Sequence, residues 1–186
     1  MLFDAPIPKA TSSIRTAFVR LVGKIRNEVE NTLVLNPLNA ALPRGTIVSY
    51  VQTWNGSHDV ANQVRPTTDN TDFLVPPAAR CNQQFVGVLE TEAAAGSAAN
   101  LTPAIARHGG GPVFVRLIGA LDLHVGDAIW ATSDHAQYGM GTNTTVALEP
   151  IYVGMVRDLG NYDALAANGT TGCNIIVKHQ GPLILG

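Results

Sequence analysis

The chain has 186 residues, with 12 Lys plus Arg and 14 Asp plus Glu, so its formal net charge at neutral pH is -2. Charged residues make up 14%, against about 25% in an ordinary soluble domain, while the hydrophobic content of 46% is normal. This balance gives no reason to expect nucleic acid or an anionic membrane as a partner, and no apolar run is long enough to span a membrane. A folded chain so poor in charge keeps a large neutral surface, which favours lasting contacts with other proteins.

Residues 1–31 are expected to form an N-terminal arm ahead of a β-domain over residues 32–186. The start, MLFDAPIPKATSS, carries two prolines and lacks the charged-then-apolar order of a signal peptide, so we expect folding in a cytoplasm. Residues 14–30 match a helical stripe and also a strand alternation, and Gly23 weakens the helix. The arm is therefore extended, or contains a short helix or strand.

From residue 32 onwards, short runs of β-forming residues are separated by turn signals. The runs include TIVSYVQTW, FVGVLE, VFVRLIGALDLHV, DAIWAT, IYVGMVRD and NIIVKH. With no long helical pattern to cover a parallel sheet, they predict an all-β fold: a small β-barrel, β-tulip-like or sandwich domain. Residues 55–72 are expected to form a long polar loop, and residues 91–112 a small-residue segment with too many breakers for a long helix.

A weak internal repeat runs through these strands. RGTIVSY at 44–50 resembles VGDAIWA at 125–131, and FVGVLE at 85–90 resembles YVGMVRD at 152–158, in the same order. The repeat predicts paired elements on two sides of one barrel rather than a solenoid.

The stretch LDLHVGDAIWATSDHAQY, residues 121–138, holds the densest group of chemical side chains. In an extended strand Asp122 and His124 share the polar face, while the apolar face carries Val113, Val115, Leu117, Leu121, Leu123 and Val125. The Gly-Asp that follows predicts a turn into DAIWAT. We therefore expect a solvated polar face, with turns at either end of the next strand.

The sequence supports a catalytic site or a metal site in this stretch less well than it supports a solvated polar face. The adjacent residues Ser133, Asp134 and His135 cannot place the histidine between the other two, as a triad requires, and no GxSxG is present. A metal site on Asp122 and His124 needs a third ligand, and nothing in the spacing selects among the candidates His58, His108 and His179. We expect no catalytic site, no metal and no cofactor.

The glycine-rich segment, the two cysteines and the two tryptophans have ordinary structural explanations. ARHGGGP at 106–112 fits no phosphate-binding motif and predicts a flexible loop. Cys81 and Cys173 are interpreted as two buried thiols in preference to a disulfide. Trp130 is expected in the core, with an anchor in a subunit contact as the alternative, and Trp54 suits either role.

The succession RGTIVSY, FVGVLE with AAAG, GPVFVRLIGALDLHVGDAIWATSDHAQYG and YVGMVRD resembles the capsid decoration, or cement, proteins of tailed bacteriophages. The resemblance covers about residues 40–158 and consists of turns and apolar positions. It implies a small β-barrel or β-tulip domain, usually a trimer, that sits on the outer capsid surface and stabilises the assembled shell. The chain departs from the short form of that family in its longer arm, its 55–72 loop and a tail after residue 160.

The resemblance also implies the partners: the major capsid protein and further copies of the chain, with no direct nucleic-acid or membrane contact. An arm that reaches the capsid or a neighbour would use apolar anchors, and Trp54 is a further contact candidate. The expected arm anchors are Phe3, Ile7, Ile14 and Phe18. The alternatives are another virion component (a head fibre base, minor capsid or tail protein), a carbohydrate-binding β-sandwich, or a hydrolase that uses His124 and Asp122.

Overall fold

The computed structural model describes residues 31–50, 63–67, 85–97, 99–132, 137–144 and 151–178. The chain divides into two units, Met1–Glu30 and Asn31–Gly186, and all described residues belong to the second. The predicted arm and its four anchors lie outside the described residues, and so does Trp54. The arm therefore stays a prediction.

The described residues form ten β-strands and no α-helix, so the predicted all-β fold is confirmed. The strands are β1 Asn31–Asn36, β2 Ile47–Tyr50, β3 Val64–Pro66, β4 Phe85–Leu89, β5 Thr102–Arg107, β6 Gly110–Leu117, β7 Ala128–Ala131, β8 Gly141–Thr142, β9 Tyr152–Asp158 and β10 Thr171–Val177.

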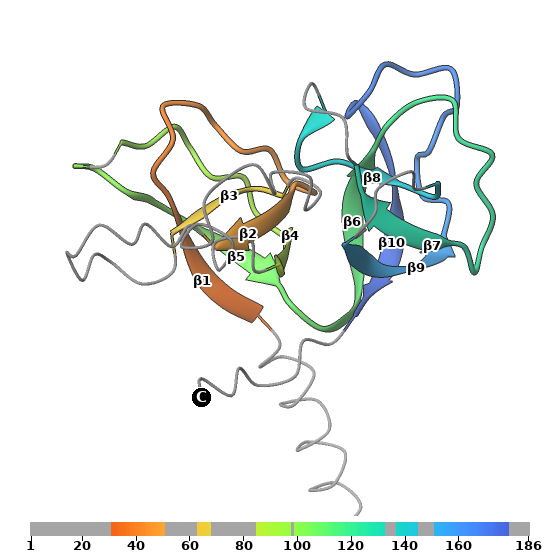
Figure 1. Ribbon diagram of the computed structural model, residues 1–186, viewed down its shortest axis with the longest axis horizontal. Coiled ribbons are helices and arrows are strands. Elements are labelled where there is room, and N and C mark those ends of the chain that lie inside the picture. Colours follow the sequence, from red (N-terminus) through yellow and green to blue (C-terminus); the bar gives the residue numbers. More distant parts are fainter. Residues whose placement is uncertain are drawn as a thin grey trace, which may run out of the picture. The chain divides into compact units, whose positions relative to one another are not determined.

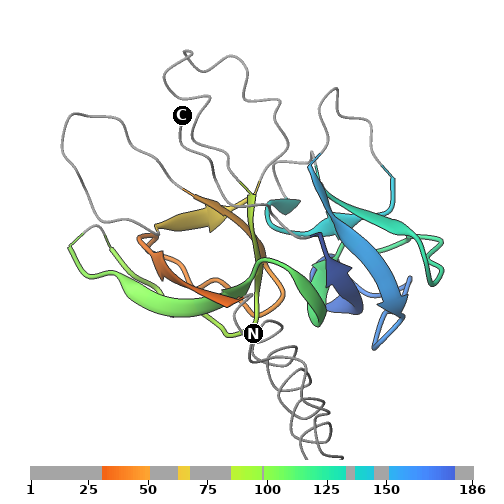
Figure 2. The same cartoon turned by 90° about the horizontal axis from the view of Figure 1, so that it is seen from below.

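The strands divide into two groups, which Figures 1 and 2 show as separate sets of arrows. Strands β1–β5, here called the first module, form a sheet in the order β1-β5-β4-β2-β3. Strands β6–β10, the second module, form a closed barrel in the order β10-β6-β8-β7-β9. The barrel closes through a parallel pair, Leu117 with Gly141. In the first module an isolated parallel bridge, Leu35 with Gln63, joins the corresponding edges.

The two modules have the same strand order and the same register. Val48 of β2 pairs with Gly87 of β4, and Ile129 of β7 pairs with Gly154 of β9. In both pairs the register shifts at the next residue of the first strand. Strands β1 to β5 therefore correspond one by one to β6 to β10, and residues 31–50 correspond to 112–131 without a gap.

A glycine performs the same function in both modules. A Cβ added to Gly87 would lie 1.9 Å from the carbonyl oxygen of Arg107, and one added to Gly154 would lie 2.2 Å from that of Ile176. Both distances are far inside van der Waals contact. The glycine of each VG pair is needed because the neighbouring strand's backbone passes directly over it.

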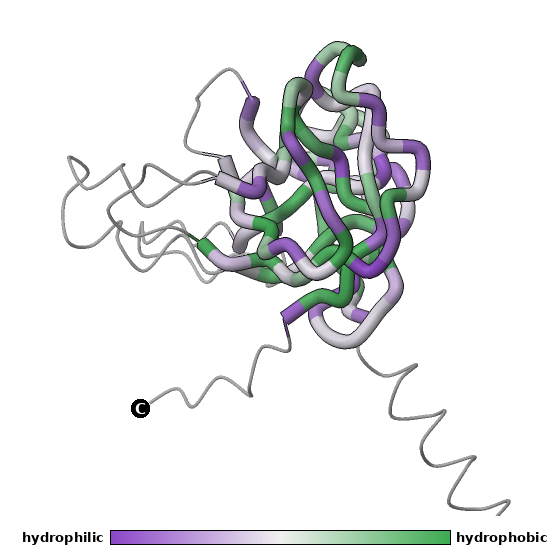
Figure 3. The backbone as a smooth tube through the Cα atoms, turned by 90° about the vertical axis from the view of Figure 1, so that its right-hand side faces the viewer, coloured by the Kyte–Doolittle hydropathy of each residue, from purple (hydrophilic) through white to green (hydrophobic). Residues whose placement is uncertain are grey.

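The two hydrophobic cores also match position by position. Alternation along the strands, visible as interleaved apolar and polar stretches in Figure 3, turns one side chain in two inward. The matched buried pairs are Val34 and Val115, Leu42 and Leu123, Val48 and Ile129, Val86 and Val153, Leu89 and Val156, Ala104 and Cys173, and Ala106 and Ile175.

The predicted repeat is thus confirmed as a correspondence, of β2 with β7 and of β4 with β9, but its placement on two sides of one barrel is wrong. The segments 44–50 and 85–90 pair with each other in the first module, and 125–131 pairs with 152–158 in the second. The remaining strands of each module come from segments that share no visible sequence pattern. For this reason the repeat suggested two sides of one barrel instead of two modules.

Three further predictions need correction. The strand predicted through residue 125 ends at Leu117, and Val125 stands in the following turn with 65% of its surface exposed. The small-residue segment contains strand β5, and its glycine run 109–111 leads directly into β6 instead of forming a flexible loop. The predicted 55–72 loop contains β3, which pairs with β2.

The modules pack on each other through the turn that precedes β2. The backbone N–H of Arg116 donates to the carbonyl oxygen of Gly45 at 3.0 Å, and the Arg44 guanidinium lies 5.8 Å from the ring centroid of Phe114. Ile47, which lies on β2, joins the core cluster of the second module, and Val88 of β4 does the same. The two modules therefore share buried apolar surface.

Candidate functional site

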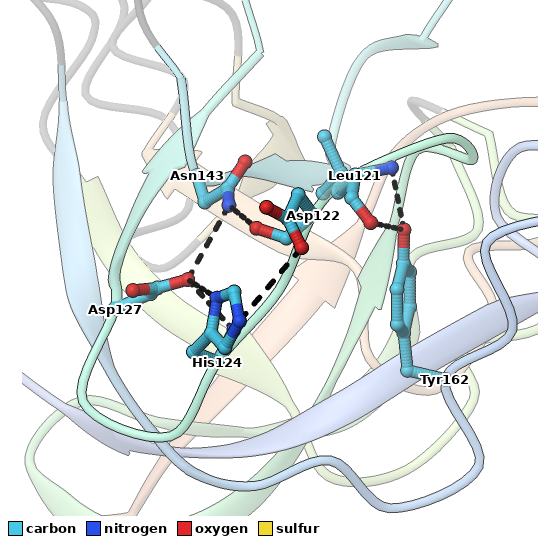
Figure 4. Close-up of polar contacts among 6 residues, drawn as sticks. All are labelled: Leu121, Asp122, His124, Asp127, Asn143 and Tyr162. Carbon is cyan, nitrogen blue, oxygen red and sulfur yellow. Dashed lines mark hydrogen bonds and ion pairs between the residues drawn. The ribbon is translucent and has the colours of Figure 1, made fainter.

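The polar side chains at the turn between β6 and β7 lie close together, as Figure 4 shows. His124 Nε2 lies 3.8 Å from Asp122 Oδ1, and His124 Nδ1 lies 3.9 Å from Asp127 Oδ2. These distances exceed the length of a hydrogen bond. The Asp122 and His124 side chains are 96% and 71% exposed, so the two groups form the solvated face that the sequence predicts.

Asp127 holds this turn in shape. Its Oδ2 accepts a hydrogen bond from the backbone N–H of His124 at 2.8 Å. Asn143 donates through Nδ2 to the carbonyl oxygen of Asp122 at 2.6 Å and lies 3.4 Å from Asp127 Oδ2. The His124 N–H is the main cause that lowers the pKa of Asp127, because it favours the charged carboxylate.

The corresponding turn of the first module is built without acidic or imidazole groups. There Thr46 donates to the carbonyl oxygen of Pro43 through its N–H at 3.2 Å and its hydroxyl at 2.7 Å. In the second module the N–H of Asp127 donates to the carbonyl oxygen of His124 at 3.1 Å. Because the fold forms this turn twice, Asp127 is explained by turn geometry.

No group of three or more His, Cys, Asp or Glu side chains suited to a metal ion occurs among the described residues. Of the candidate third ligands, His108 follows β5, while His58 and His179 lie outside the described residues. Ser133, Asp134 and His135 also lie outside them.

Cys173 lies in the core of the second module as a free, fully buried thiol. Burial, and to a lesser extent the charge of Asp158, raises the pKa of this thiol to about 12. It therefore stays protonated and unreactive at neutral pH. The predicted buried thiol is confirmed for Cys173, whereas Cys81 lies outside the described residues.

Tyr162 ties the loop after β9 to the loop after β6, a contact that sequence reasoning missed. Its hydroxyl accepts a hydrogen bond from the N–H of Leu121 at 2.6 Å and donates to the carbonyl oxygen of the same residue at 3.0 Å (Figure 4). Burial is the main cause that raises the pKa of Tyr162. A tyrosine in a turn-rich tail carries no signal that could have indicated this partner.

Apolar side chains on the outside of the two modules are the second candidate site. The large apolar residues exposed in the described part of the chain are Leu33, Ile105, Val125, Met155, Leu159 and Leu165. Leu33 and Ile105 pair directly across β1 and β5, with 56% and 39% of their surface exposed. The β1–β5 face is defined here as the outward side chains Leu33, Leu35, Pro103 and Ile105.

The second module carries a comparable surface on β7 and β9. Met155, 47% exposed, pairs with Ala128, and Val125 stands in the turn that leads into β7. Trp130 and Tyr152 pair on the same side, with ring centroids 5.2 Å apart and planes inclined by 58°. The β7–β9 face is defined as Val125, Ala128, Trp130, Tyr152 and Met155.

The position of Trp130 differs from the predicted core position and agrees with the alternative, an anchor in a subunit contact. It is half-buried and belongs to neither hydrophobic core, so its expected place in the core is wrong. Its ring lies against Tyr152, and the ammonium group of Lys178 lies 5.7 Å from the centroid of that tyrosine. A large aromatic side chain at the surface is the residue type that anchors protein contacts.

Comparison of the chain with models of known protein families gives no match, and comparison with curated proteins gives none either. Among the described residues no helix has the length and apolar character needed to cross a membrane. The described surface offers two apolar faces on β-strands and one solvated turn.

Proposed function

We propose that the chain is a structural virion protein: a decoration, or cement, protein that binds the outer surface of a bacteriophage capsid and stabilises the assembled shell. In this proposal it acts by contact and catalyses no reaction, its partners are the major capsid protein and other copies of the chain, and it works as a homotrimer. Its place is the outer capsid surface, after synthesis in the host cytoplasm.

The observation that carries the proposal is the pair of outward apolar faces on the two β-modules. Exposed Leu33 and Ile105 on one module, and Val125 and Met155 on the other, are side chains that a monomer in water gains nothing by exposing. The resemblance of residues 40–158 to decoration proteins agrees with this. A ligand that binds only the assembled shell stabilises it by mass action, and many copies multiply the effect.

A different virion component, such as a head fibre base, a minor capsid protein or a tail protein, is the alternative. It would use the same kind of surface, so copy number separates the two. A decoration protein is expected in numbers close to those of the major capsid protein. Quantitative mass spectrometry of purified particles measures this ratio, and a few copies per particle would contradict the proposal.

The attachment itself is tested by adding the purified chain to particles that lack it. The full chain is expected to bind and to raise the temperature at which the particles release DNA. A variant without residues 1–20 is expected to stay folded by circular dichroism but to lose attachment, because the proposed arm carries Phe3, Ile7, Ile14 and Phe18. Full attachment of the shortened variant would contradict the arm's role.

A further inference from the structure

Inside the chain, one face of the first module docks on one face of the second. The docking face, the β2–β4 face, consists of Arg44, Gly45, Ile47 and Val88. The receiving face, the β6–β10 face, consists of Phe114, Arg116 and Gly172. A Cβ added to Gly45 would lie 2.8 Å from Phe114 Cδ1 and 2.9 Å from Arg116 Cγ, so the turn rests directly on this surface. Burial lowers the pKa of Arg116, whose Nη1 lies 3.5 Å from Thr46 Oγ1.

Because the modules share one fold, each of these faces has a counterpart in the other module. The β2–β4 face corresponds to Val125, Gly126, Ala128 and Met155, which lie on or beside the β7–β9 face. The β6–β10 face corresponds to Leu33, Leu35 and Pro103 of the β1–β5 face. The register of the strands fixes these correspondences.

These counterparts, on the β7–β9 face and the β1–β5 face, are exposed, whereas the β2–β4 and β6–β10 faces cover each other. A Cβ added to Gly126 would meet nothing within 4 Å, in contrast to Gly45, although both glycines have the positive φ that this turn requires. Four of the six exposed large apolar side chains in the described part of the chain lie on these two faces. The remaining two, Leu159 and Leu165, belong to the loop after β9.

We propose that the β7–β9 face of one copy docks on the β1–β5 face of a second copy, and so repeats between chains the contact that exists within the chain. The matched residues fit this pairing. Where Arg44 stacks on Phe114 inside the chain, the contact between chains would bring Val125 onto Leu33, two exposed apolar side chains. Apolar contact of this kind is the main favourable term in protein association.

This contact joins two different faces, so each chain carries one of each and the assembly is head-to-tail. Such an interface closes into a ring or continues as a filament, and a closed ring of three chains would contain six modules in equivalent contacts. The proposed contact is argued from the correspondence of the two modules and not from the proposed capsid function. Self-association is measured on the purified chain alone, so the two proposals can fail separately.

The first test replaces apolar side chains on each face separately. V125E/M155E alters the β7–β9 face and L33E/I105E alters the β1–β5 face. L165E, at a residue 95% exposed and on neither face, is the matched control. By sedimentation velocity the wild type and L165E are expected to have the mass of an oligomer, and both double variants that of a monomer. A wild type that stays monomeric at about 100 µM, well above a micromolar Kd, would overturn the proposal. Double variants that keep the oligomeric mass would overturn it as well.

Mixing the two double variants distinguishes this interface from a symmetric one. V125E/M155E keeps its β1–β5 face and L33E/I105E keeps its β7–β9 face, so one intact contact is available. The mixture is expected to form a one-to-one dimer and nothing larger. A mixture that stays monomeric would overturn the head-to-tail arrangement. The arrangement would also be overturned if L33E/I105E left self-association unchanged and the β1–β5 face were needed only for capsid attachment or for contact with residues 1–30.

A covalent test follows from the correspondence with Arg44 and Phe114. In a Cys81→Ser background, L33C/V125C is expected to form disulfides between chains under mild oxidation, seen as covalent oligomers on non-reducing gels. L33C/L165C is the control and is expected to remain single chains. Equal cross-linking of both variants would contradict the proposed register.

Discussion

At the scale of single residues, the polar groups that most resemble a catalytic site serve a turn. Asp127 accepts the backbone N–H of His124, and the imidazole points into solvent with 71% of its side chain exposed. The same turn exists in the first module with Pro43 and Thr46 in these positions. Aspartate occurs both in catalytic sites and in turns, and the contacts of Asp127 show that its role in this protein is to stabilise a turn.

Asp127→Ala is expected to lower the free energy of unfolding by about 1 kcal/mol at pH 7, the usual worth of one such hydrogen bond. The pKa of Asp127 is lowered in the folded state, so its contribution is complete above the unfolded pKa of about 3.9 and is lost as the pH falls through the folded pKa. Urea unfolding at pH 7 and pH 3 should show the difference between variant and wild type shrink at the lower pH.

Asp122→Ala is the matched control for this experiment. Its carboxylate is 96% exposed, so the change is expected to stay within about 0.5 kcal/mol at either pH. An equal loss in both variants would mean that the turn depends on the summed negative charge and not on the hydrogen bond of Asp127.

At the scale of elements, the repeated glycine determines how closely three strands can pack. Gly87 lies in β4 and Gly154 in β9, each under the backbone of the next strand, β5 or β10. The sequence repeat of FVGVLE and YVGMVRD is therefore a repeat of one packing requirement. The alternation around the glycine is what turns Val86 and Val153 into their cores.

Gly87→Ala and Gly154→Ala are each expected to destabilise the protein by about 3 kcal/mol, because the new methyl group would meet a main-chain carbonyl oxygen that cannot move alone. Gly126→Ala is the comparison: it has open space and only a left-handed backbone to strain, at a cost of about 1 kcal/mol. Chemical denaturation of the three variants measures the ranking. Equal losses would show that the close approach is relieved by a shift of the strands.

At the scale of the whole molecule, apolar side chains of the first module pack in the core of the second module and join the two. Ile47 and Val88 are fully buried in the cluster of the second module, although their strands belong to the first. Full burial of a valine or isoleucine is worth about 1.5–3 kcal/mol. We therefore expect the two modules to unfold together.

The same substitution at corresponding positions tests this coupling. Val88→Asp places an unpaired carboxylate between the modules and is expected to cost about 3 kcal/mol or more and to split unfolding into two transitions. Met155→Asp, at the corresponding exposed position, is expected to change stability by less than about 0.5 kcal/mol when measured on the monomer. Differential scanning calorimetry at low protein concentration reads both effects, and a single unchanged transition for Val88→Asp would contradict the coupling.

The sequence by itself determined the fold class, most of the strands and the solvated character of Asp122 and His124. These follow from local causes: alternation of apolar residues, turn-forming residues and the absence of long helical stripes. It also indicated that 44–50 corresponds to 125–131 and 85–90 to 152–158, because the same glycine requirements recur in the same order.

Only the tertiary structure decided that these pairs belong to two modules, that β3 and β5 are strands, and that Trp130 and Val125 face outward. Strand β5 is built mainly of small residues and β3 is short, so both are held by pairing across the sheet, which leaves no periodic trace in the chain. Which apolar face is covered depends on how one module docks on the other. That docking joins residues far apart in sequence, such as Gly45 and Arg116, whose contact no local pattern encodes.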